Sequence, residues 1–376
     1  MQTVNIQTHC SLPWSRFDSM FGSFCCKNTL HRRFSSFDEI QKSKHVQQIK
    51  NDLLAGIKNQ ACNQCWQEDA ADKLSTRKIS LQTIGGVNKS EQDLLHEIEN
   101  NKLRQLILYT GNSCNLACRT CGGNLSSTHT VEAKAKKLKD PRVHIHPITK
   151  PDFTKYLNQD YSCLESIHVM GGEPLLNVEH TVVLEKISQD GHANKCHLTY
   201  NTNGTHALSK KHYEILHNFG TVNFVFSIDA VGEQFNYLRT GADWQLVTKN
   251  IKEIRQSLTN FPNSHASVHL TISVLNILYL EELYAWLENQ DLEVHFNFCF
   301  YPQHYSFELF NTAQKQYVDY YLSQSKYDMT PIRNFLKNSQ YNADLQHKFW
   351  REVDWTHEYH NMALDTYLPK LAKLLG

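Results

Sequence analysis

The sequence predicts an α/β protein built around a parallel sheet. From about residue 150 onward, runs rich in β-branched and aromatic residues alternate with helix-like stretches, which is the pattern of successive βα units. An apolar run before residue 110 brings the expected strands to six, at 103–109, 164–170, 196–202, 222–228, 266–274 and 292–299. Helices are expected between them, near 207–218, 243–258 and 279–289. The alternation alone leaves open whether the sheet is doubly wound or curves into a barrel.

Composition narrows the class of protein. The 376-residue chain, 40% hydrophobic, can form one large domain with an appendage or two domains. Its 38 Lys and Arg residues balance 38 Asp and Glu residues, which disfavours generic nucleic-acid binding. No apolar stretch approaches the roughly 20 residues of a membrane helix, and the first residues lack a signal-peptide pattern, so we expect a cytoplasmic protein without membrane binding. In that reducing compartment, 11 cysteines favour metal binding over disulfides.

The first eighty residues carry the first group of cysteines: Cys10, Cys25, Cys26, Cys62 and Cys65. Two short strands are expected at 12–17 and 19–24, around a turn at Gly22, followed by a helical stretch near 36–57. Four thiolates drawn from this group suit either zinc or an iron–sulfur cluster. We treat residues 1–80 as a module and 81–102 as a linker with a short helix capped by Ser90.

The second group of cysteines is Cys114, Cys118 and Cys121, in a loop that follows the strand at 103–109. Catalytic loops of α/β barrels lie at this carboxyl end of the strands. A structural zinc site takes four protein ligands, and a catalytic one usually mixes in nitrogen or oxygen donors. A cubane cluster can instead be held by three thiolates, which leaves one iron open, so the loop favours iron–sulfur chemistry. The basic stretch at 134–139 is either a solvated helix or a substrate contact.

Polar residues follow the later strands. After the second strand come Gly171, Gly172, Glu173 and Pro174, where glycines allow close approach to the backbone and the acid suits an α-ammonium group. A tight turn is the alternative. Asn203 lies in the turn after the third strand. Ser227 and Asp229, two residues apart at the end of the fourth strand, share a face and suit a ribose diol.

Further candidates are less specific. Arg239 pairs either with a cofactor carboxylate or with Asp229, or else lies on the surface. Thr271, Ser273 and Asn276 are polar candidates on and after the fifth strand. The sixth strand places one set of side chains on one face, which is either a substrate-facing or a mixed buried surface: His295, Asn297, Cys299 and Tyr301. Cys163, Cys196 and Cys299 are expected to be small core residues, although a thiol at the Cys299 position could donate a hydrogen atom.

Together, the three-cysteine loop, the Gly-Gly-Glu-Pro segment and the Ser-x-Asp pair resemble the radical S-adenosylmethionine (radical SAM) superfamily. The resemblance implies a partial (β/α)6, TIM-like barrel at 103–305, open on one side, and a helical C-terminal region at 306–376. It also implies that Cys114, Cys118 and Cys121 hold a [4Fe–4S] cluster whose open iron binds S-adenosyl-L-methionine. The implied cofactor-binding residues are Gly171, Gly172, Glu173, Pro174, Asn203, Ser227, Asp229 and Arg239. Thr120 departs from the aromatic residue that many members have before the last cluster cysteine, which alters packing near the adenine without removing a ligand.

The first eighty residues resemble the auxiliary-cluster modules described as twitch- or SPASM-like. The resemblance implies a second [4Fe–4S] cluster on Cys10, Cys62, Cys65 and one of Cys25 and Cys26. The C-terminal segment from Asp354 to Leu375 is expected to be an amphipathic helix, because leucines recur in it at helical spacing.

The resemblance implies a radical SAM enzyme that cleaves S-adenosylmethionine reductively to a 5′-deoxyadenosyl radical, which abstracts a hydrogen atom from the substrate. We expect the substrate to be a peptide or protein undergoing modification. The alternatives are a small metabolite, sugar or nucleotide as substrate, and, in another class, a zinc-binding scaffold without catalysis. A flavodoxin or ferredoxin is the expected electron donor.

Overall fold

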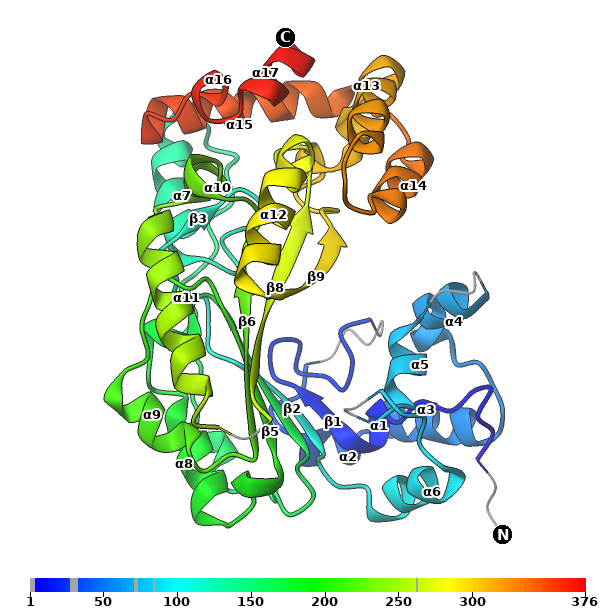
Figure 1. The fold of residues 1–376 in the computed structure, drawn as a ribbon. Coiled ribbons are helices and arrows are strands. Elements are labelled where there is room, and N and C mark those ends of the chain that lie inside the picture. Colours follow the sequence, from blue (N-terminus) through cyan, green and yellow to red (C-terminus); the bar gives the residue numbers. More distant parts are fainter. Residues whose placement is uncertain (1–3, 28–32, 71–73, 84–85, 262) are drawn as a thin grey trace.

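The molecule is organised around one parallel sheet. The structure, a computed structural model, describes residues 4–27, 33–70, 74–83, 86–261 and 263–376 (Figure 1). Seven strands lie in the order β1-β2-β4-β5-β6-β8-β9, and every neighbouring pair is parallel. They are β1 (Arg16–Asp18), β2 (Gln105–Tyr109), β4 (Ser166–Met170), β5 (His197–Thr202), β6 (Thr221–Ser227), β8 (His265–Ile272) and β9 (Glu293–Phe298). The expected α/β class and parallel sheet are confirmed, and the six expected strands are all present.

The two faces of the sheet differ in polarity. Along β4 and β5 buried residues such as Val169 and Leu198 alternate with half-buried ones such as His168 and Asn201. Because successive side chains of a strand point to opposite faces, the buried set covers one face and the polar set the other. The buried face belongs to the main hydrophobic core, together with helix residues such as Leu184. The other face, called the inner face below, is lined mostly by polar side chains.

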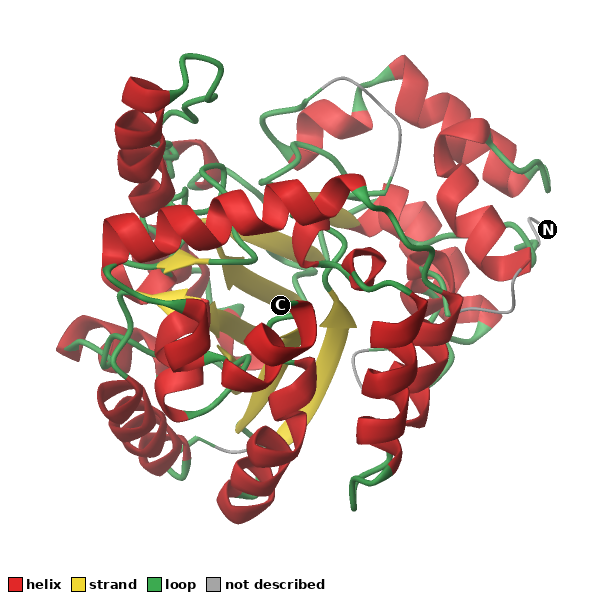
Figure 2. Cartoon of the chain, turned by 90° about the horizontal axis from the view of Figure 1, so that it is seen from above, coloured by secondary structure: helices red, strands yellow, loops and turns green. Residues whose placement is uncertain are grey.

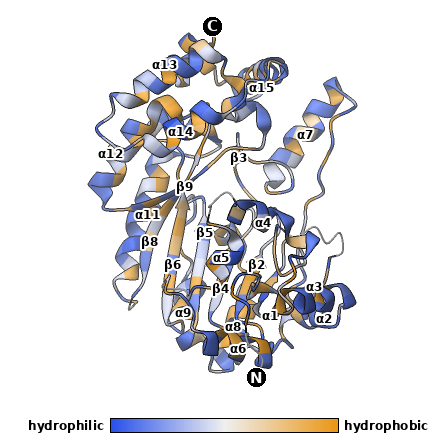
Figure 3. Cartoon of the chain, turned by 90° about the vertical axis from the view of Figure 1, so that its right-hand side faces the viewer, coloured by the Kyte–Doolittle hydropathy of each residue, from blue (hydrophilic) through white to orange (hydrophobic). Residues whose placement is uncertain are grey.

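Helices follow the strands and cover the buried face (Figures 1 and 2). They are α8 (Thr181–Gln189), α9 (Lys210–Leu216), α10 (Gly232–Leu238), α11 (Trp244–Leu258) and α12 (Leu280–Gln290). The Asp243 carboxylate caps α11 by accepting from the backbone N–H groups of Gln245 and Leu246, which satisfies donors that a helix start leaves free. The hydropathy colouring in Figure 3 shows hydrophobic residues along β6 and many hydrophilic residues on the surrounding helices. The helices expected between the later strands are thus confirmed within a few residues.

The N-terminal residues contribute a strand to the main sheet. They form α1 (Leu12–Ser15), β1, α2 (Phe37–Gln41), α3 (Lys44–Leu54), α4 (Asn63–Ala70) and α5 (Thr76–Ser80). The two short strands expected at 12–17 and 19–24 are wrong, because Pro13 opens a helical turn and only 16–18 pair with β2. The linker contains α6 (Glu91–Asn100), which a capping box of Ser90 and Asp93 starts as expected. Residues 84 and 85 of the linker lie outside the described residues. The same holds for residues 1–3, part of the N-terminus in which we expect no signal peptide.

Two short strands form a separate antiparallel pair, β3 (Ala117–Cys118), labelled on the left of Figure 1 below α10, and β7 (Arg239–Thr240). The helix α7 (Ser127–Lys139) lies beside them. The C-terminal region contains α13 (Thr312–Ser323), α14 (Thr330–Asn338), α15 (Asp344–His360), α16 (Leu364–Tyr367) and α17 (Pro369–Leu375). The single amphipathic helix expected from Asp354 to Leu375 is wrong, because Asn361 ends α15 in a left-handed conformation (φ 56°). None of the helices in the described part combines the length and apolar character that crossing a bilayer requires.

Candidate active site

The polar residues singled out from the sequence gather at the carboxyl ends of neighbouring strands. The three-cysteine loop follows β2, Glu173 follows β4, Asn203 follows β5 and Asp229 follows β6. Because these strands are parallel and adjacent, their ends meet at one edge of the sheet. The tertiary structure therefore brings residues more than a hundred positions apart into one site.

The thiols of the loop are largely withdrawn from solvent. Cys114 and Cys118 are buried and Cys121 is half-buried. Burial, and next the neighbouring Cys118, raises the pKa of the Cys114 thiol to about 11. The Cys121 thiol donates to the Cys118 sulfur, and this hydrogen bond lowers the pKa of Cys118 and raises that of Cys121. The loop thus holds its sulfurs close together and away from water.

Asn203 connects the loop to Glu173. Its side-chain amide lies 3.8 Å from the Cys114 sulfur and 3.2 Å from the Asn115 side-chain oxygen. Its backbone N–H donates to the Glu173 carboxylate at 2.7 Å, and the Thr202 hydroxyl donates to the same carboxylate at 2.8 Å. Glu173 is only 1% exposed, and this burial raises its pKa to about 7 despite the hydrogen bonds. A carboxylate held in this way would be stabilised by a cationic ligand.

Gly171 and Gly172 allow the segment after β4 to pack directly on the cysteine loop. A Cβ atom at Gly172 would lie 2.3 Å from the Ser113 carbonyl oxygen, and one at Gly171 would lie 2.4 Å from the Thr110 hydroxyl. The backbone N–H groups of Gly172 and Glu173 donate to the loop at 2.8 Å each. The close approach provided by the glycines is therefore to the loop itself. Pro174 is buried at the start of the short 3₁₀ turn Pro174–Leu176.

Arg239 lies between Cys118 and Asp229. The pairing of β3 with β7 places Arg239 opposite Cys118, and its guanidinium lies 3.7 Å from the Cys118 sulfur. The same guanidinium forms an ion pair with Asp229 at 2.6 Å. Of the two partners expected for Arg239, the structure thus provides Asp229, and the surface alternative is wrong because Arg239 is buried. Asp229 also accepts from the Thr271 N–H at 2.8 Å, while Ser227 remains half-buried on the inner face.

The inner face carries a row of polar side chains below this site. The strand register places Ser227 opposite His269 and His269 opposite His295, with Thr271 and Asn297 one pair further along. The side chains become more exposed toward β9, the last strand of the sheet. This row can offer neutral hydrogen-bond donors and acceptors to a bound molecule.

The remaining candidates fall into different places. Ser273 and Asn276 are buried and bond to each other and to the backbone, so they support the chain rather than line the inner face. The expected shared face of His295, Asn297, Cys299 and Tyr301 is wrong beyond Phe298, where β9 ends: Cys299 is buried and Tyr301 is exposed. Cys196 and Cys299 are buried as expected, but Cys163 is half-exposed and is not a core residue.

A second group of thiols surrounds a small cavity in the N-terminal part. Its walls include Cys10, Cys25, Cys62 and Cys65, together with Leu12, Phe24, Lys27, Trp66 and Arg77. Burial raises the pKa of Cys10 and of Cys62, the latter to about 12. Cys26 is exposed, so of the adjacent pair it is Cys25 that faces the cavity.

The number of thiols in each group suits an iron–sulfur cluster, and the four of the second group also suit zinc. In the described residues no three His, Cys, Asp or Glu side chains lie close enough together to hold a metal ion as they stand. The first group adds N–H donors at two of its sulfurs, from Asn203 and Arg239. Around the second, Lys27 and Arg77 supply positive charge near four thiols. Three or four cysteines with such donors match the ligands of a cubane cluster.

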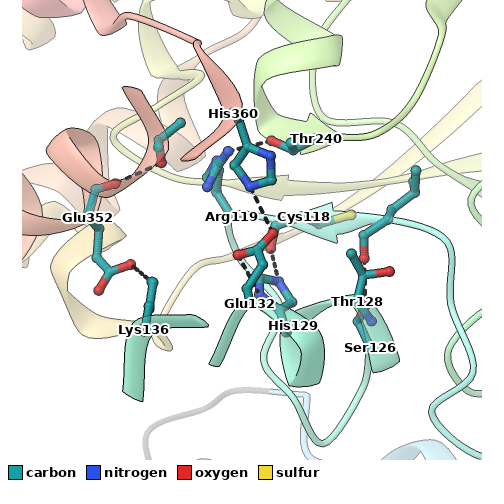
Figure 4. A network of polar contacts seen from close by, with 12 residues as sticks. Cys118, Arg119, Ser126, Thr128, His129, Glu132, Lys136, Thr240, Glu352 and His360 are labelled. Carbon is teal, nitrogen blue, oxygen red and sulfur yellow. Dashed lines mark hydrogen bonds and ion pairs between the residues drawn. The ribbon is translucent and has the colours of Figure 1, made fainter. Parts of the chain in front are cut away.

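Several residues of the site were not expected from the sequence. His129 and Glu132 on α7 and His360 on α15 form a chain of contacts that ends at the Cys118 carbonyl (Figure 4). The sequence did contain one signal for this contact, because a histidine and an acid three residues apart on a helix lie side by side. The basic stretch at 134–139 also faces α15, through the ion pairs Lys136–Glu352 and Lys139–Glu358.

Comparison with protein families gives one match. Residues 108–287, somewhat less than half of the chain, match the model of the Radical SAM superfamily. Comparison with curated proteins gives no match.

Similar solved structures include anSMEcpe with bound AdoMet, at 17% identity and a TM-score of 0.42, covering 64% of this chain and 63% of that one. Streptococcus suis SuiB bound to precursor peptide SuiA is 14% identical, with a TM-score of 0.39 and coverages of 78% and 64%. The radical S-adenosylmethionine methyltransferase TsrM from Kitasatospora setae is 11% identical, with a TM-score of 0.36 and coverages of 58% and 40%. The chain spans less than two thirds of the length of each.

Proposed function

We propose that the protein is a radical SAM enzyme whose catalytic cluster is held by Cys114, Cys118 and Cys121. The observation that carries this proposal is that two residues each connect a thiol of the loop to an acid. Asn203 contacts both Cys114 and Glu173. Arg239 contacts both Cys118 and Asp229. Three thiolates leave one coordination position of a cubane cluster for a ligand. When bound, the cluster supplies the electron that cleaves S-adenosylmethionine to the 5′-deoxyadenosyl radical, which takes a hydrogen atom from the substrate.

In this proposal the protein's own residues bind and orient. The buried Glu173 carboxylate already accepts three hydrogen bonds. In this proposal it also accepts a hydrogen bond from the cofactor ammonium, whose positive charge offsets the cost of burying the carboxylate. Asp229 and Ser227 contact the ribose hydroxyls, and Arg239 holds Asp229 in place. Gly171, Gly172 and Pro174 keep Glu173 against the loop. The buried setting limits access of water to a reactive radical.

We propose that the N-terminal cavity holds a second [4Fe–4S] cluster on Cys10, Cys25, Cys62 and Cys65. Four thiols in a largely apolar cavity, with Lys27 and Arg77 nearby, support a fully coordinated cluster. Such a cluster would accept or donate an electron. A flavodoxin or ferredoxin would supply the electrons that both clusters need.

A peptide or protein is our proposed substrate. The inner-face row of Ser227, His269 and His295 suits the amide groups of a polypeptide. A phosphorylated metabolite or nucleotide would call for available cations, whereas the buried Arg239 is already paired with Asp229. The row leads to β9, whose outer edge pairs with no other described strand. A strand edge of this kind presents backbone groups with which an extended peptide pairs.

The proposal is tested by anaerobic reconstitution of the full-length protein. About eight irons per chain are expected from two cubane clusters, and the reduced protein should convert S-adenosylmethionine to 5′-deoxyadenosine. Stoichiometric zinc without iron would instead favour the scaffold alternative.

The substrate class is tested with peptides encoded next to the gene, beside panels of sugars and nucleotides. Deuterated peptides should transfer deuterium into 5′-deoxyadenosine. Transfer from a sugar or nucleotide alone would contradict the peptide assignment.

A further inference from the structure

The first turn of α7 holds the backbone of the cysteine loop at several points. The Thr128 hydroxyl donates to the Cys114 carbonyl at 2.8 Å, and the Ser127 hydroxyl accepts from the Cys114 N–H at 3.1 Å. The Ser126 hydroxyl donates to the Leu116 carbonyl. A fourth contact comes from His129, whose Nε2 lies 2.8 Å from the Cys118 carbonyl oxygen. Because a carbonyl only accepts, Nε2 carries the proton in this contact.

The helix α7 is in turn fixed by α15. Glu132 follows His129 by one turn on the same face of α7, and its carboxylate lies 2.8 Å from His360 Nε2 and 3.8 Å from His129 Nδ1 (Figure 4). Glu132 is only 3% exposed. Burial opposes its ionisation, but the hydrogen bond with His360 and the nearby His129 and Arg119 lower its pKa, so the carboxylate is charged. A buried charge of this kind strongly favours the arrangement that keeps its partner.

More exposed ion pairs continue the contact between the two helices. Lys136 pairs with Glu352, and Lys139 pairs with Glu358 at 2.6 Å. The Lys139 and Glu358 side chains are both more than half exposed, so solvent weakens their attraction. The buried contact between Glu132 and His360 is therefore the one that fixes the position of α7 relative to α15.

We propose that His129 is a positioning residue for the cysteine loop, and that the contact between Glu132 and His360 sets its position. This inference rests on the proposed function, since it takes the loop to carry the catalytic cluster. It assigns a role to α15, which lies outside the region 108–287 that matches the radical SAM model. Replacing a group that orients a metal ligand through a hydrogen bond commonly lowers the affinity for the metal.

The test compares His129→Phe, which keeps a ring but removes the donor, with His129→Gln, which keeps an N–H donor. Glu132→Gln and His360→Gln alter the link to α15, and Lys139→Gln is the matched control on the same two helices. In the reconstituted full-length protein, His129→Phe should release the iron bound by Cys114, Cys118 and Cys121 to a chelator on the order of tenfold faster than wild type. Glu132→Gln and His360→Gln should show intermediate rates, while His129→Gln and Lys139→Gln should resemble wild type.

Hydrogen exchange of the cluster-free protein gives a readout that does not require iron. Amide exchange across 114–121 should be faster in His129→Phe and His360→Gln than in wild type and Lys139→Gln, with unchanged exchange in α11. Equal exchange in all variants, or an equal effect of Lys139→Gln and His360→Gln, would overturn the inference. A wild-type protein that takes up no iron would count against the proposed function, and the exchange data would still decide the role of His129.

Discussion

The two groups of cysteines differ in what surrounds their sulfur atoms. At the carboxyl ends of the sheet strands three thiols lie beside polar groups, with Asn203 and Arg239 at two of the sulfurs. In the N-terminal cavity four thiols share walls with apolar side chains, and the two nearby cations, Lys27 and Arg77, are each paired with an acid. In the proposed function, the three thiols of the first group leave one position of a cluster for a polar ligand, whereas the four thiols of the second group complete the ligands of theirs. The proposal thus assigns chemistry to the first group and electron transfer to the second, on ligand number and surrounding polarity.

Replacing Cys114, Cys118 and Cys121 by alanine should have the largest effect. Formation of 5′-deoxyadenosine should be lost completely, and iron should fall from about eight to about four per chain because the second group keeps its cluster. Product is measured by chromatography and iron by colorimetric assay. Cys163→Ala, at a half-exposed thiol outside both groups, is the control and should change neither value. Continued cleavage in the triple variant would show that the three-cysteine loop is not the catalytic site.

Replacing Cys62 and Cys65 by alanine should remove about half of the iron but leave cleavage of S-adenosylmethionine intact. The adjacent thiols sharpen this comparison, since Cys25 faces the cavity and Cys26 is exposed. Cys25→Ser should therefore lower the iron content, while Cys26→Ser should not. Loss of all cluster absorbance in the double variant would show that the two groups do not load independently.

Glu173→Gln tests whether the polar surroundings of the three-cysteine loop serve the cofactor. Removing the charge from the carboxylate should weaken binding of S-adenosylmethionine by roughly 10- to 100-fold, because a charge-assisted hydrogen bond is lost. Calorimetric titration of the reconstituted protein measures the affinity. Glu165→Gln alters a half-exposed acid that pairs with Arg104 at the amino ends of β2 and β4, opposite to the candidate site, and this variant should bind as wild type does. Unchanged affinity in Glu173→Gln would remove Glu173 from the cofactor site.

The smallest expected effects come from replacing one cationic side chain beside each group of cysteines. Arg239 is buried and contacts both Asp229 and Cys118, so Arg239→Lys should slow cleavage by about tenfold, since lysine cannot reproduce the guanidinium geometry. Lys27 is partly exposed and paired with Glu68, so Lys27→Gln should alter iron content and cleavage less than about twofold. Initial rates at saturating cofactor measure both. A larger effect of Lys27→Gln would mean that the N-terminal cavity controls catalysis.

Much of the fold could be predicted because its signals are local. The strand at 222–228, for example, reads as alternating apolar positions, and the structure forms β6 at Thr221–Ser227. Two elements escaped this reasoning. β1 has only three residues and exists because β2 provides a partner, and the pair β3–β7 joins two-residue segments that carry no periodic signal.

The sequence by itself determined which side chains are candidate ligands, because the cysteine spacing and the Gly-Gly-Glu-Pro segment are patterns of a few consecutive residues. It also limited Arg239 to a few partners, and the resemblance limited the proposed second cluster to one of two adjacent thiols. Only the tertiary structure decided that Arg239 meets Asp229 and Cys118, that Cys25 faces the cavity, and that His129 reaches the Cys118 carbonyl. The physical reason is that these contacts join segments whose proximity depends on strand order, helix packing and burial, which no local pattern records.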